Sequence, residues 1–396
     1  MRYLSVCSGI EAATQAWHPL GWTPVAFSEI EPFPSAVLAH HYPHVPNWGD
    51  MTKFEDWPDE PIDLLCGGTP CQDYSVAGQR LGMAGARGQL TLTFVEIAAR
   101  YRPDWLVWEN VPGVLSSNGG RDFARFLGDL SGTVIEVPVC GWSNSGIIAG
   151  VGDAYGIAYR VLDAQHVRTR RFPFAVPQRR RRVWVVGYLG DWRRAAAVLF
   201  DRESLSGHPA PRREAGQRPA AGITASTGGC SGEDDASEDG TGRQNLVPIT
   251  LMQRGREDGP SIEWRQDGTA NALLTPNGGR AGMGVGCVAA PVAFDLTQIT
   301  SAANRSIPQP VSPTMAKASN LHAFTPWVVR RLTPRECERL QGFPDDFTAI
   351  PWRKKPADQC PDGPRYKALG NSWAVNCAGW IGERIAMVNS IMEAAE

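Results

Sequence analysis

The stretch Gly67-Gly68-Thr69-Pro70-Cys71-Gln72-Asp73-Tyr74-Ser75 decides how the rest of the chain is organised. It follows the apolar run Ile62-Asp63-Leu64-Leu65-Cys66, which is typical of a buried parallel strand. Glycines there allow a sharp turn and a close approach to a ligand, and Pro70 stiffens the loop. We therefore expect Cys71 at the carboxyl end of a strand, where open α/β sheets bind their ligands. Taken alone, this loop is equally consistent with a buried structural cysteine.

Composition bounds the class of protein. The chain has 396 residues, enough for two domains or for one large domain with an insertion. It contains no 18-residue apolar run and no signal-peptide pattern, so we expect a cytoplasmic protein without membrane contact. Nine scattered cysteines, without Cys-x-x-Cys or His-Glu-x-x-His, argue against disulfides and against a bound metal. Net charge is only −2, but the arginine-rich stretch 168–194 provides a local basic cluster for phosphates.

Strand-like and helix-like segments alternate through the first half of the chain. Apolar runs predict strands at residues 3–7, 24–28, 62–66, 105–109 and 183–188. Helical periodicity predicts helices at residues 11–18, 33–41, 90–101 and 122–130. This alternation predicts an α/β fold with a doubly wound, mostly parallel, Rossmann-like sheet.

The pattern changes after residue 190. Residues 202–245 contain only Leu205 and Ile223 as large apolar side chains, which predicts a flexible segment. Residues 246–330 are rich in Gly, Asn, Thr and Pro and predict a smaller, irregular, β-poor domain. A capping box at 333–336 predicts a helix that Gly342 ends, and Asn371-Ser372 predicts the start of a final helix at about 374–394. The expected division is 1–190, 191–330 and 331–396.

Small residues after the first strand and acidic residues after the next ones predict a cofactor site. The loop that follows Val6 is suited to cradling a nucleotide-like cofactor, although it lacks a complete G-x-G-x-x-G. Glu29, about twenty residues on, is placed to bind ribose hydroxyls, and Asp50 an exocyclic amine. A P-loop lysine is absent, so S-adenosylmethionine is favoured over a triphosphate. Solvated strand ends are the alternative reading of both acidic residues. The predicted cofactor residues are Cys7, Ser8, Gly9, Ile10, Glu29, Ile30, Asp50, Met51, Gly68, Pro70, Asn371 and Ser372.

Two further elements carry charged groups to the same edge. Glu109 ends an apolar strand, and a carboxyl group in a partly dry pocket should have a raised pKa. In the run Gln178-Arg179-Arg180-Arg181-Arg182, strand alternation would point Arg180 and Arg182 to one face. A solvated basic face is the alternative for this run, and simple helix capping is the alternative for the turn around Asn371 and Ser372.

Taken in order, these motifs resemble those of the cytosine-5 DNA methyltransferases over roughly residues 3–188 and 330–390. The matching elements are Pro70-Cys71-Gln72, Glu109-Asn110-Val111, Gln178 with Arg180 and Arg182, Arg335-Glu336-Cys337 through Gly342-Phe343-Pro344, and Gly370-Asn371-Ser372. The chain departs from the family pattern at four places. These are Cys7 where an aromatic residue is usual, Glu11-Ala12 where glycines are usual, Thr69 before the Pro-Cys pair, and an apparent insertion at 166–175.

The resemblance implies a chemistry and a substrate. Cys71 would be the nucleophile, assisted by Glu109, Arg180 and Arg182, and S-adenosylmethionine the methyl donor. The substrate would be cytosine flipped out of double-stranded DNA, with residues 190–330 reading the sequence. Residues 313–315 are favoured over 272–275 for supporting the flipped base. The implied DNA contacts are Gln72, Ser75, Arg87, Gln178 and Thr314. We expect a monomeric, nucleoid-associated enzyme with a possible cognate restriction endonuclease.

Three other functions compete with this interpretation. A tRNA cytosine-5 methyltransferase would share the same motif order, although the long region 190–330 favours DNA. A thiol hydrolase or glutaminase needs a histidine beside its cysteine, and none of the seven histidines stands in a strand-end motif. A catalytically inactive DNA-binding regulator is the non-enzyme alternative, and an intact set of Cys71, Glu109 and Arg182 argues against it. The sequence does not predict the target site.

Overall fold

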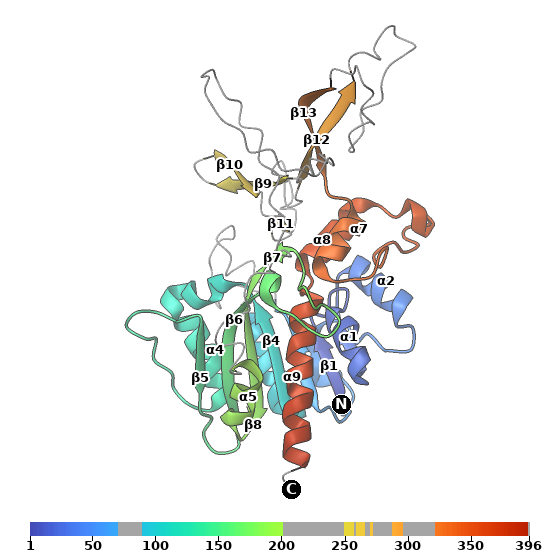
Figure 1. Ribbon diagram of the computed structural model, residues 1–396. Coiled ribbons are helices and arrows are strands. Elements are labelled where there is room, and N and C mark those ends of the chain that lie inside the picture. Colours follow the sequence, from blue (N-terminus) through green and yellow to red (C-terminus); the bar gives the residue numbers. More distant parts are fainter. Residues whose placement is uncertain are drawn as a thin grey trace.

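A seven-stranded mixed sheet organises the catalytic half of the protein (Figure 1). The computed structural model describes residues 1–69, 89–200, 249–256, 259–265, 270–271, 287–295 and 321–394. The strand order is β2-β1-β3-β4-β8-β6-β5. Strands β2, β1, β3 and β4 are parallel, whereas β8, β6 and β5 continue the sheet antiparallel. The strands are β1 (Arg2–Val6), β2 (Thr23–Ser28), β3 (Leu64–Gly67), β4 (Trp105–Asn110), β5 (Ser145–Ile148), β6 (Tyr155–Asp163) and β8 (Arg181–Leu189).

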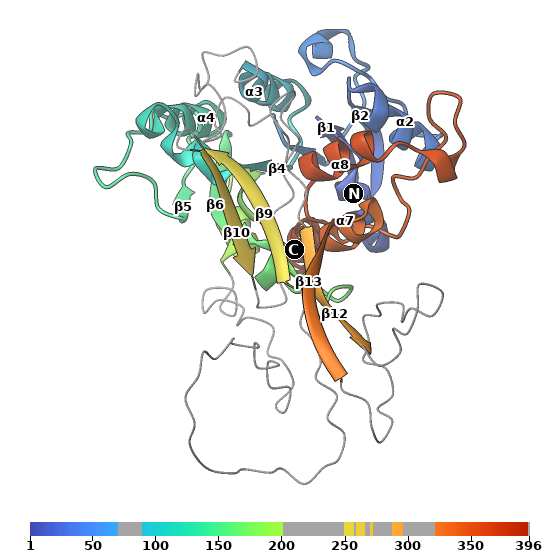
Figure 2. The same cartoon turned by 90° about the horizontal axis from the view of Figure 1, so that it is seen from above.

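Helices cover both faces of the sheet, as the doubly wound class predicts. On one face α3 and α4 pack on the sheet through Phe94 and Phe126, and Figure 2 shows these helices together on one side. On the other face α1, α5 and α9 enclose a core that includes Trp17 and Trp184. The helices are α1 (Ala12–Trp17), α2 (Pro32–His41), α3 (Gln89–Tyr101), α4 (Arg121–Ser131), α5 (Trp192–Leu199), α7 (Pro334–Gln341), α8 (Asp362–Asn371) and α9 (Val375–Glu393). Short 3-10 helices are η1 (His18–Leu20), η2 (Met51–Asp56), η4 (Pro112–Gly120), η5 (Ala164–His166) and η7 (Ala357–Gln359).

The predicted strands and helices of the first half are confirmed to within two residues, but β5 and β6 were not foreseen. In β6, a Cβ atom at Gly156 would lie 2.1 Å from the backbone nitrogen of Trp192. Glycine is therefore required for α5 to pack on this strand. A glycine in the middle of a strand also interrupts the apolar pattern from which a strand is predicted.

The region after α5 contains a second sheet, so the expectation of a β-poor domain is wrong. Its order is β10-β9-β12-β13, and all its strands pair antiparallel. Residues 296–320 separate β12 from its partner β13. The local sequence pattern of one strand does not indicate a partner that is so distant in sequence. A short strand, β11, pairs with β7 beside the first sheet. The strands are β7 (Gln178–Arg179), β9 (Ile249–Arg256), β10 (Gly259–Arg265), β11 (Ala270–Asn271), β12 (Cys287–Asp295) and β13 (Leu321–Arg331).

The return segment confirms one helix boundary and corrects another. Thr333 and Glu336 form the predicted capping box of α7, and Gly342 ends that helix with φ 84°. Asn371, however, is the last residue of α8 and Ser372 its C-cap, where the Ser372 N–H donates to the carbonyls of Ala368 and Leu369. The final helix predicted at about 374–394 is confirmed as α9, Val375–Glu393, but Asn371-Ser372 is not its N-terminal signal. These residues look like an N-cap, but their backbone groups already terminate a helix.

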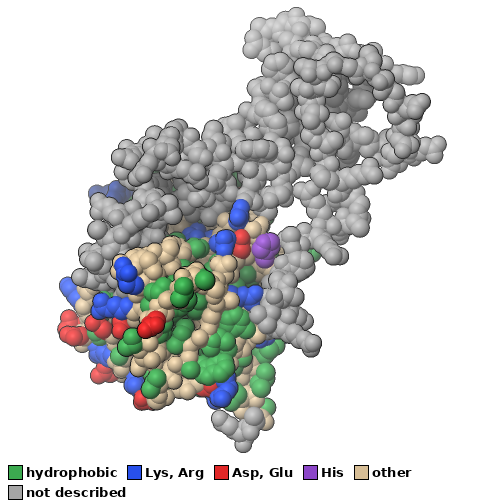
Figure 3. Space-filling model, turned by 90° about the vertical axis from the view of Figure 1, so that its left-hand side faces the viewer, with side chains coloured by type: hydrophobic (Ala, Val, Ile, Leu, Met, Phe, Trp, Pro, Cys, Tyr) green, Lys and Arg blue, Asp and Glu red, His purple; other side chains and the backbone are tan. Residues whose placement is uncertain are grey.

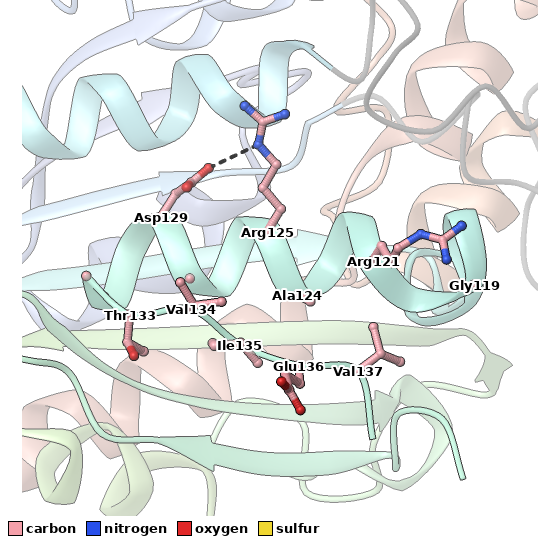
Figure 4. Close-up of a pocket in the computed structure, with 12 residues that line it drawn as sticks. Gly119, Arg121, Ala124, Arg125, Asp129, Thr133, Val134, Ile135, Glu136 and Val137 are labelled. Atoms are coloured by element: carbon pink, nitrogen blue, oxygen red, sulfur yellow. Dashed lines mark ion pairs between the residues drawn. The ribbon is translucent and has the colours of Figure 1, made fainter. Parts of the chain in front are cut away.

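A solvent-open groove lies on the α4 side, away from the predicted site residues. It measures about 930 Å³ and lies between α4 and residues 132–137, with Arg125 3.6 Å from Asp129 along its wall (Figure 4). Exposed apolar side chains, among them Val134 and Ile147, occur near the edge strand β5, on the side viewed in Figure 3. None of the predicted site residues lines this groove. Within the described residues, no helix is long and apolar enough to cross a membrane.

Candidate active site

The carboxyl ends of β1, β3 and β4 meet at one edge of the sheet. Val6 pairs with Gly67, Gly67 pairs with Trp108, and Asn110 lies opposite Val183 on β8. This register brings the loop after β1, the residues Gly68 and Thr69, and the end of β4 to the same edge. In Figure 1 the short strands β7 and β11 lie directly above it. The predicted gathering of strand ends is confirmed.

Glu109 and Arg182 form a buried ion pair at this edge. The Arg182 Nε atom lies 3.0 Å from Glu109 Oε1, and the two side chains are only 16% and 9% exposed. Burial raises the pKa of Glu109, and the charges of Arg182 and Arg180 oppose that rise. The expected upward direction is thus confirmed. Burial favours the protonated form and the two arginines favour the ionised form, so the carboxyl group is placed to exchange a proton with a bound ligand.

The side chain of Arg180 shares the inner face with Arg182, as strand alternation predicts. Arg180 is 2% exposed, whereas Arg179 and Arg181 face solvent. Its Nη2 atom donates to the carbonyl oxygens of Ser372 (2.6 Å) and Gly370 (3.2 Å). Arg180 therefore ties the end of α8 to the edge of the sheet, while Arg182 is the arginine that pairs with Glu109.

Thr69, the residue before Pro70, is fixed by a buried hydrogen-bond cluster. Its Oγ1 atom accepts from Trp108 Nε1 at 3.1 Å and lies 3.0 Å from the hydroxyl of Thr91. Asn110 donates to the Thr69 carbonyl at 3.3 Å and accepts the backbone N–H of Val111 at 2.8 Å. The strand that carries Glu109 thereby positions the backbone that leads into Cys71. Thr69 was noted only as a departure from the family pattern, and its anchoring role was missed.

Trp373 explains why position 68 is glycine. A Cβ atom at Gly68 would lie 2.6 Å from Trp373 Nε1 and 3.4 Å from Glu109 Oε2. The Trp373 ring packs edge-on against Trp184, with centroids 4.9 Å apart, and lies near Trp17. Trp373 was not among the predicted site residues. The signal available was its place directly after Ser372.

The loop after β1 has an unusual backbone that joins it to β2. Cys7, Gly9 and Glu11 have left-handed φ angles of 50°, 57° and 62°. The N–H of Gly9 donates to Glu29 Oε2 at 2.8 Å, and the Ser8 hydroxyl donates to the Ser5 carbonyl. Gly9 and Glu29 are therefore brought together, as the sequence predicts for a cofactor site.

The remaining predicted cofactor residues divide between surface and core. Ile30 is 66% exposed beside Glu29, and Asp50 caps η2 by accepting from Thr52. Met51 and Ile10 are buried instead, and Met51 Sδ lies 3.4 Å from Cys7 Sγ. Because the Ile10 side chain is buried, only its backbone could contact a ligand.

Of the predicted DNA-binding residues, Gln178 alone lies within the described part of the chain. Gln178 is fully buried, and neither its amide oxygen nor its amide nitrogen has a hydrogen-bond partner among the described residues. Outside the described residues lie Pro70, Cys71, Gln72, Ser75, Arg87 and Thr314. In the part of the chain that is described, no cluster of His, Cys, Asp and Glu is arranged to hold a metal ion.

A doubly wound sheet with a buried carboxyl–guanidinium pair and a small-residue loop at one edge is typical of a cofactor-dependent α/β enzyme. Residues 1–137 and 147–387 match the model of the C-5 cytosine-specific DNA methylase family. The chain belongs to this family.

Individual relatives carry methyltransferase names of more than one kind. The chain is 25% identical, over 98% of its length, to the type II methyltransferase M2.BsuMI of Bacillus subtilis (strain 168), covering 75% of that protein. It is 37% identical, over 97% of its length, to a protein of Escherichia phage P1 named DNA N-6-adenine-methyltransferase, and spans 61% of that relative. The S. pombe Dnmt2 methyltransferase shares the fold, with a TM-score of 0.52, 14% identity and coverage of 99% of both chains.

Proposed function

We propose that this protein transfers the methyl group of S-adenosylmethionine to carbon 5 of a flipped-out cytosine in a specific duplex DNA sequence. The observation that supports this most is the buried Glu109–Arg182 pair, next to the anchored Gly68-Thr69 turn that leads into Cys71. A nucleophile, a proton-holding carboxyl group and an arginine are the groups that activation of a pyrimidine ring requires.

The residues at the edge fit S-adenosylmethionine, which supplies an electrophilic methyl group when bound. Glu29 offers a carboxylate for ribose hydroxyls, held by the backbone N–H groups of Gly9 and Glu31. The exposed Ile30 side chain offers an apolar surface for a flat base. Asp50, the N-cap of η2, would accept a hydrogen bond from the exocyclic amine of the base.

Covalent attack explains the need for a thiol. Carbon 5 of cytosine is a poor nucleophile while the ring is aromatic. Addition of the Cys71 thiolate to carbon 6 makes carbon 5 enamine-like, and carbon 5 then takes the methyl group. The hydrogen at carbon 5 leaves as a proton, and the ring electrons expel the thiolate.

Glu109 and Arg182 would stabilise the charge that this attack develops. The pyrimidine ring gains electron density as the thiolate adds, chiefly at ring nitrogen 3 and at the carbonyl oxygen. Protonated Glu109 donates to ring nitrogen 3, and Arg182 holds the carbonyl oxygen. Arg180 would act as a positioning residue, because its guanidinium binds the backbone at the end of α8.

DNA recognition would fall to the second sheet and to the loops beside the edge. The target carbon is out of reach inside a duplex, so the base must be flipped. We assign Gln72, Ser75, Arg87, Gln178 and Thr314 to DNA contacts, with residues 191–330 as the recognition domain. The buried amide of Gln178, which has no hydrogen-bond partner within the described part of the chain, supports its assignment.

Adenine is a second candidate target, because of the name of the phage P1 relative. An exocyclic amine carries its own lone pair, so it needs neither a thiol adduct nor the Glu109–Arg182 pair. Cytosine is therefore favoured. Nucleoside mass spectrometry of DNA and tRNA from cells expressing the full chain tests this. We expect 5-methylcytosine in DNA, whereas N6-methyladenine in DNA or 5-methylcytosine confined to tRNA would contradict the proposal.

Glu29→Ala is expected to weaken S-adenosylmethionine binding by roughly ten- to a hundredfold, through loss of charge-assisted hydrogen bonds worth about 1.5–3 kcal/mol. Isothermal titration calorimetry measures this directly. Glu31→Ala is the matched control, because its exposed carboxylate pairs with Lys367 and does not contact Gly9. Equal affinities in the two variants would remove Glu29 from the site.

Shortening residues 202–245 to a brief Gly/Ser linker is expected to leave solubility and methylation nearly intact. These residues lie outside the described part of the chain, and the expectation rests on their composition. Each halving or doubling of a flexible loop changes its closure free energy by only about 0.6 kcal/mol. Soluble expression and methylation rate measure the outcome, and an insoluble product would identify a structured element in this segment.

A further inference from the structure

Glu11 is a buried acidic residue beneath the cofactor loop to which the proposed reaction assigns no role. It caps α1 with a left-handed backbone (φ 62°, ψ 64°), in a position where the resembled family usually has glycine. Its side chain is only 1% exposed. A charged residue in a conformation that favours glycine implies that the carboxylate itself has a function.

Three hydrogen bonds from Ser5 and Thr14 hold the side chain of Glu11. The Ser5 hydroxyl donates to Oε2 at 2.8 Å, and the backbone N–H and hydroxyl of Thr14 donate to Oε1 at 3.2 and 3.1 Å. Tyr3, whose hydroxyl lies 2.6 Å from that of Thr14, extends this hydrogen-bonded chain. The backbone N–H of Thr14 can only donate, whereas the Ser5 and Thr14 hydroxyls can donate to an ionised carboxylate or accept from a protonated one. These contacts can therefore hold Glu11 in either protonation state.

In the part of the chain that the structure describes, no cation pairs with the Glu11 carboxylate. The titratable groups that face it are Tyr3 on β1, Cys66 on β3 and Tyr42 after α2. Burial raises the pKa of each of these groups, so all three are neutral at physiological pH. Burial also raises the pKa of Glu11 to about 7, against the opposing effect of the Ser5 and Thr14 hydrogen bonds. Among the described residues, no Lys or Arg side chain bonds to it.

We propose that Glu11 is a specificity-determining residue that makes the site prefer the positively charged methyl donor over its neutral demethylated product. Glu11 lies two residues after Gly9, whose N–H binds Glu29 in the cofactor site. A buried negative charge without a counterion is stabilised when a sulfonium cation enters the adjoining site. A neutral sulfide brings no such stabilisation. The inference rests on the assignment of S-adenosylmethionine as the cofactor.

The sign of the pH dependence follows from linkage. A cation nearby lowers the pKa of Glu11, so binding of the sulfonium releases a proton when the free protein holds one. Affinity for the cation therefore rises as the pH rises through about 7 and then levels off. Affinity for the neutral sulfide does not change for this reason. The two ligands share their amino and carboxylate groups, so the ratio of their affinities isolates the effect of the sulfonium.

The test is calorimetric titration of the full chain with S-adenosylmethionine and S-adenosylhomocysteine between about pH 6 and about pH 8. In the wild type, the preference for the sulfonium should rise about fivefold across this range, for a pKa lowered by about one unit. Glu11→Gln should give a smaller, flat ratio. Glu60→Gln, which removes an exposed carboxylate paired with Arg2, should behave as the wild type.

Glu11→Gly guards against a folding defect, since glycine adopts the left-handed backbone freely, and it should give the same flat ratio. Binding stoichiometry reports the folded fraction in each titration. Variants that lose affinity for both ligands equally, with the pH dependence of the ratio unchanged, would overturn the inference and leave Glu11 a structural role. A wild-type chain that binds neither ligand would contradict the cofactor assignment itself.

Discussion

Cys71→Ser is expected to abolish the covalent adduct that the wild-type protein forms with duplex DNA carrying 5-fluorocytosine at the target position. After methyl transfer, release requires loss of the atom at carbon 5 as a cation, and fluorine cannot leave in this way. The wild-type reaction therefore stops as a protein–DNA adduct that survives denaturing electrophoresis, and adduct formation requires S-adenosylmethionine. A serine hydroxyl is far less acidic and less nucleophilic than a thiol, so no adduct should form.

Two controls make this result specific to Cys71. Cys71→Ala should bind the duplex nearly as tightly as the wild type, because phosphate contacts supply most of the affinity for DNA. Bisulfite sequencing of DNA from expressing cells defines the target into which the fluorinated base is placed. An adduct that persists in Cys71→Ser would identify another of the nine cysteines as the nucleophile. The proposed role of the loop after β3 would then be wrong.

Glu109→Gln is expected to slow adduct formation by a factor on the order of 10²–10⁴, the usual contribution of a positioned general acid or base. Glutamine keeps the shape of the side chain but cannot transfer a proton to ring nitrogen 3. It also leaves the Arg182 guanidinium, now 3.0 Å from a carboxylate oxygen, without its counterion. Rapid-quench measurement of the adduct on 5-fluorocytosine DNA gives the rate of attack separately from product release.

The matched control for this prediction is Glu96→Gln, an exposed residue of α3 that removes the same charge from the same domain. Glu109→Gln should bind S-adenosylmethionine as the wild type does, since Glu109 is assigned no cofactor contact. An effect on attack of less than about threefold would leave Glu109 with a packing role only. A loss confined to DNA affinity would place its function in base binding.

The part of the site that could be predicted depends on strand ends. An apolar run that stops at glycine or at a charged residue marks a strand end, and parallel strands place these ends at one edge. From the sequence alone, that rule predicts that Gly68, Glu109 and Gly9 lie at the same edge. Strand alternation likewise separated Arg180 and Arg182 from Arg179 and Arg181.

Residues whose role depends on packing between distant segments escaped prediction. Trp373 lies against Gly68 because α9 returns across the sheet, and Gly156 is glycine because α5 packs on β6. Neither relation leaves a local pattern in the sequence. The pairing of β12 with β13 escaped prediction for the same reason, since the partner strand lies on the far side of residues 296–320. Where a pattern was local, as in the capping box of Thr333, prediction succeeded.

The return of α9 to α1 has a consequence for synthesis of the protein on the ribosome. The indole N–H of Trp17 donates to the carbonyl of Ala378, a contact between residues separated by 361 positions. At about 5–20 residues per second, roughly 20–70 seconds pass between translation of these two residues. During this interval Trp17 can pack only on neighbours that are already synthesised, such as Tyr3 and Trp22, and the surface that α9 covers in the folded protein stays exposed. Premature termination anywhere before the last helix would therefore yield an aggregation-prone fragment and not a partly active enzyme.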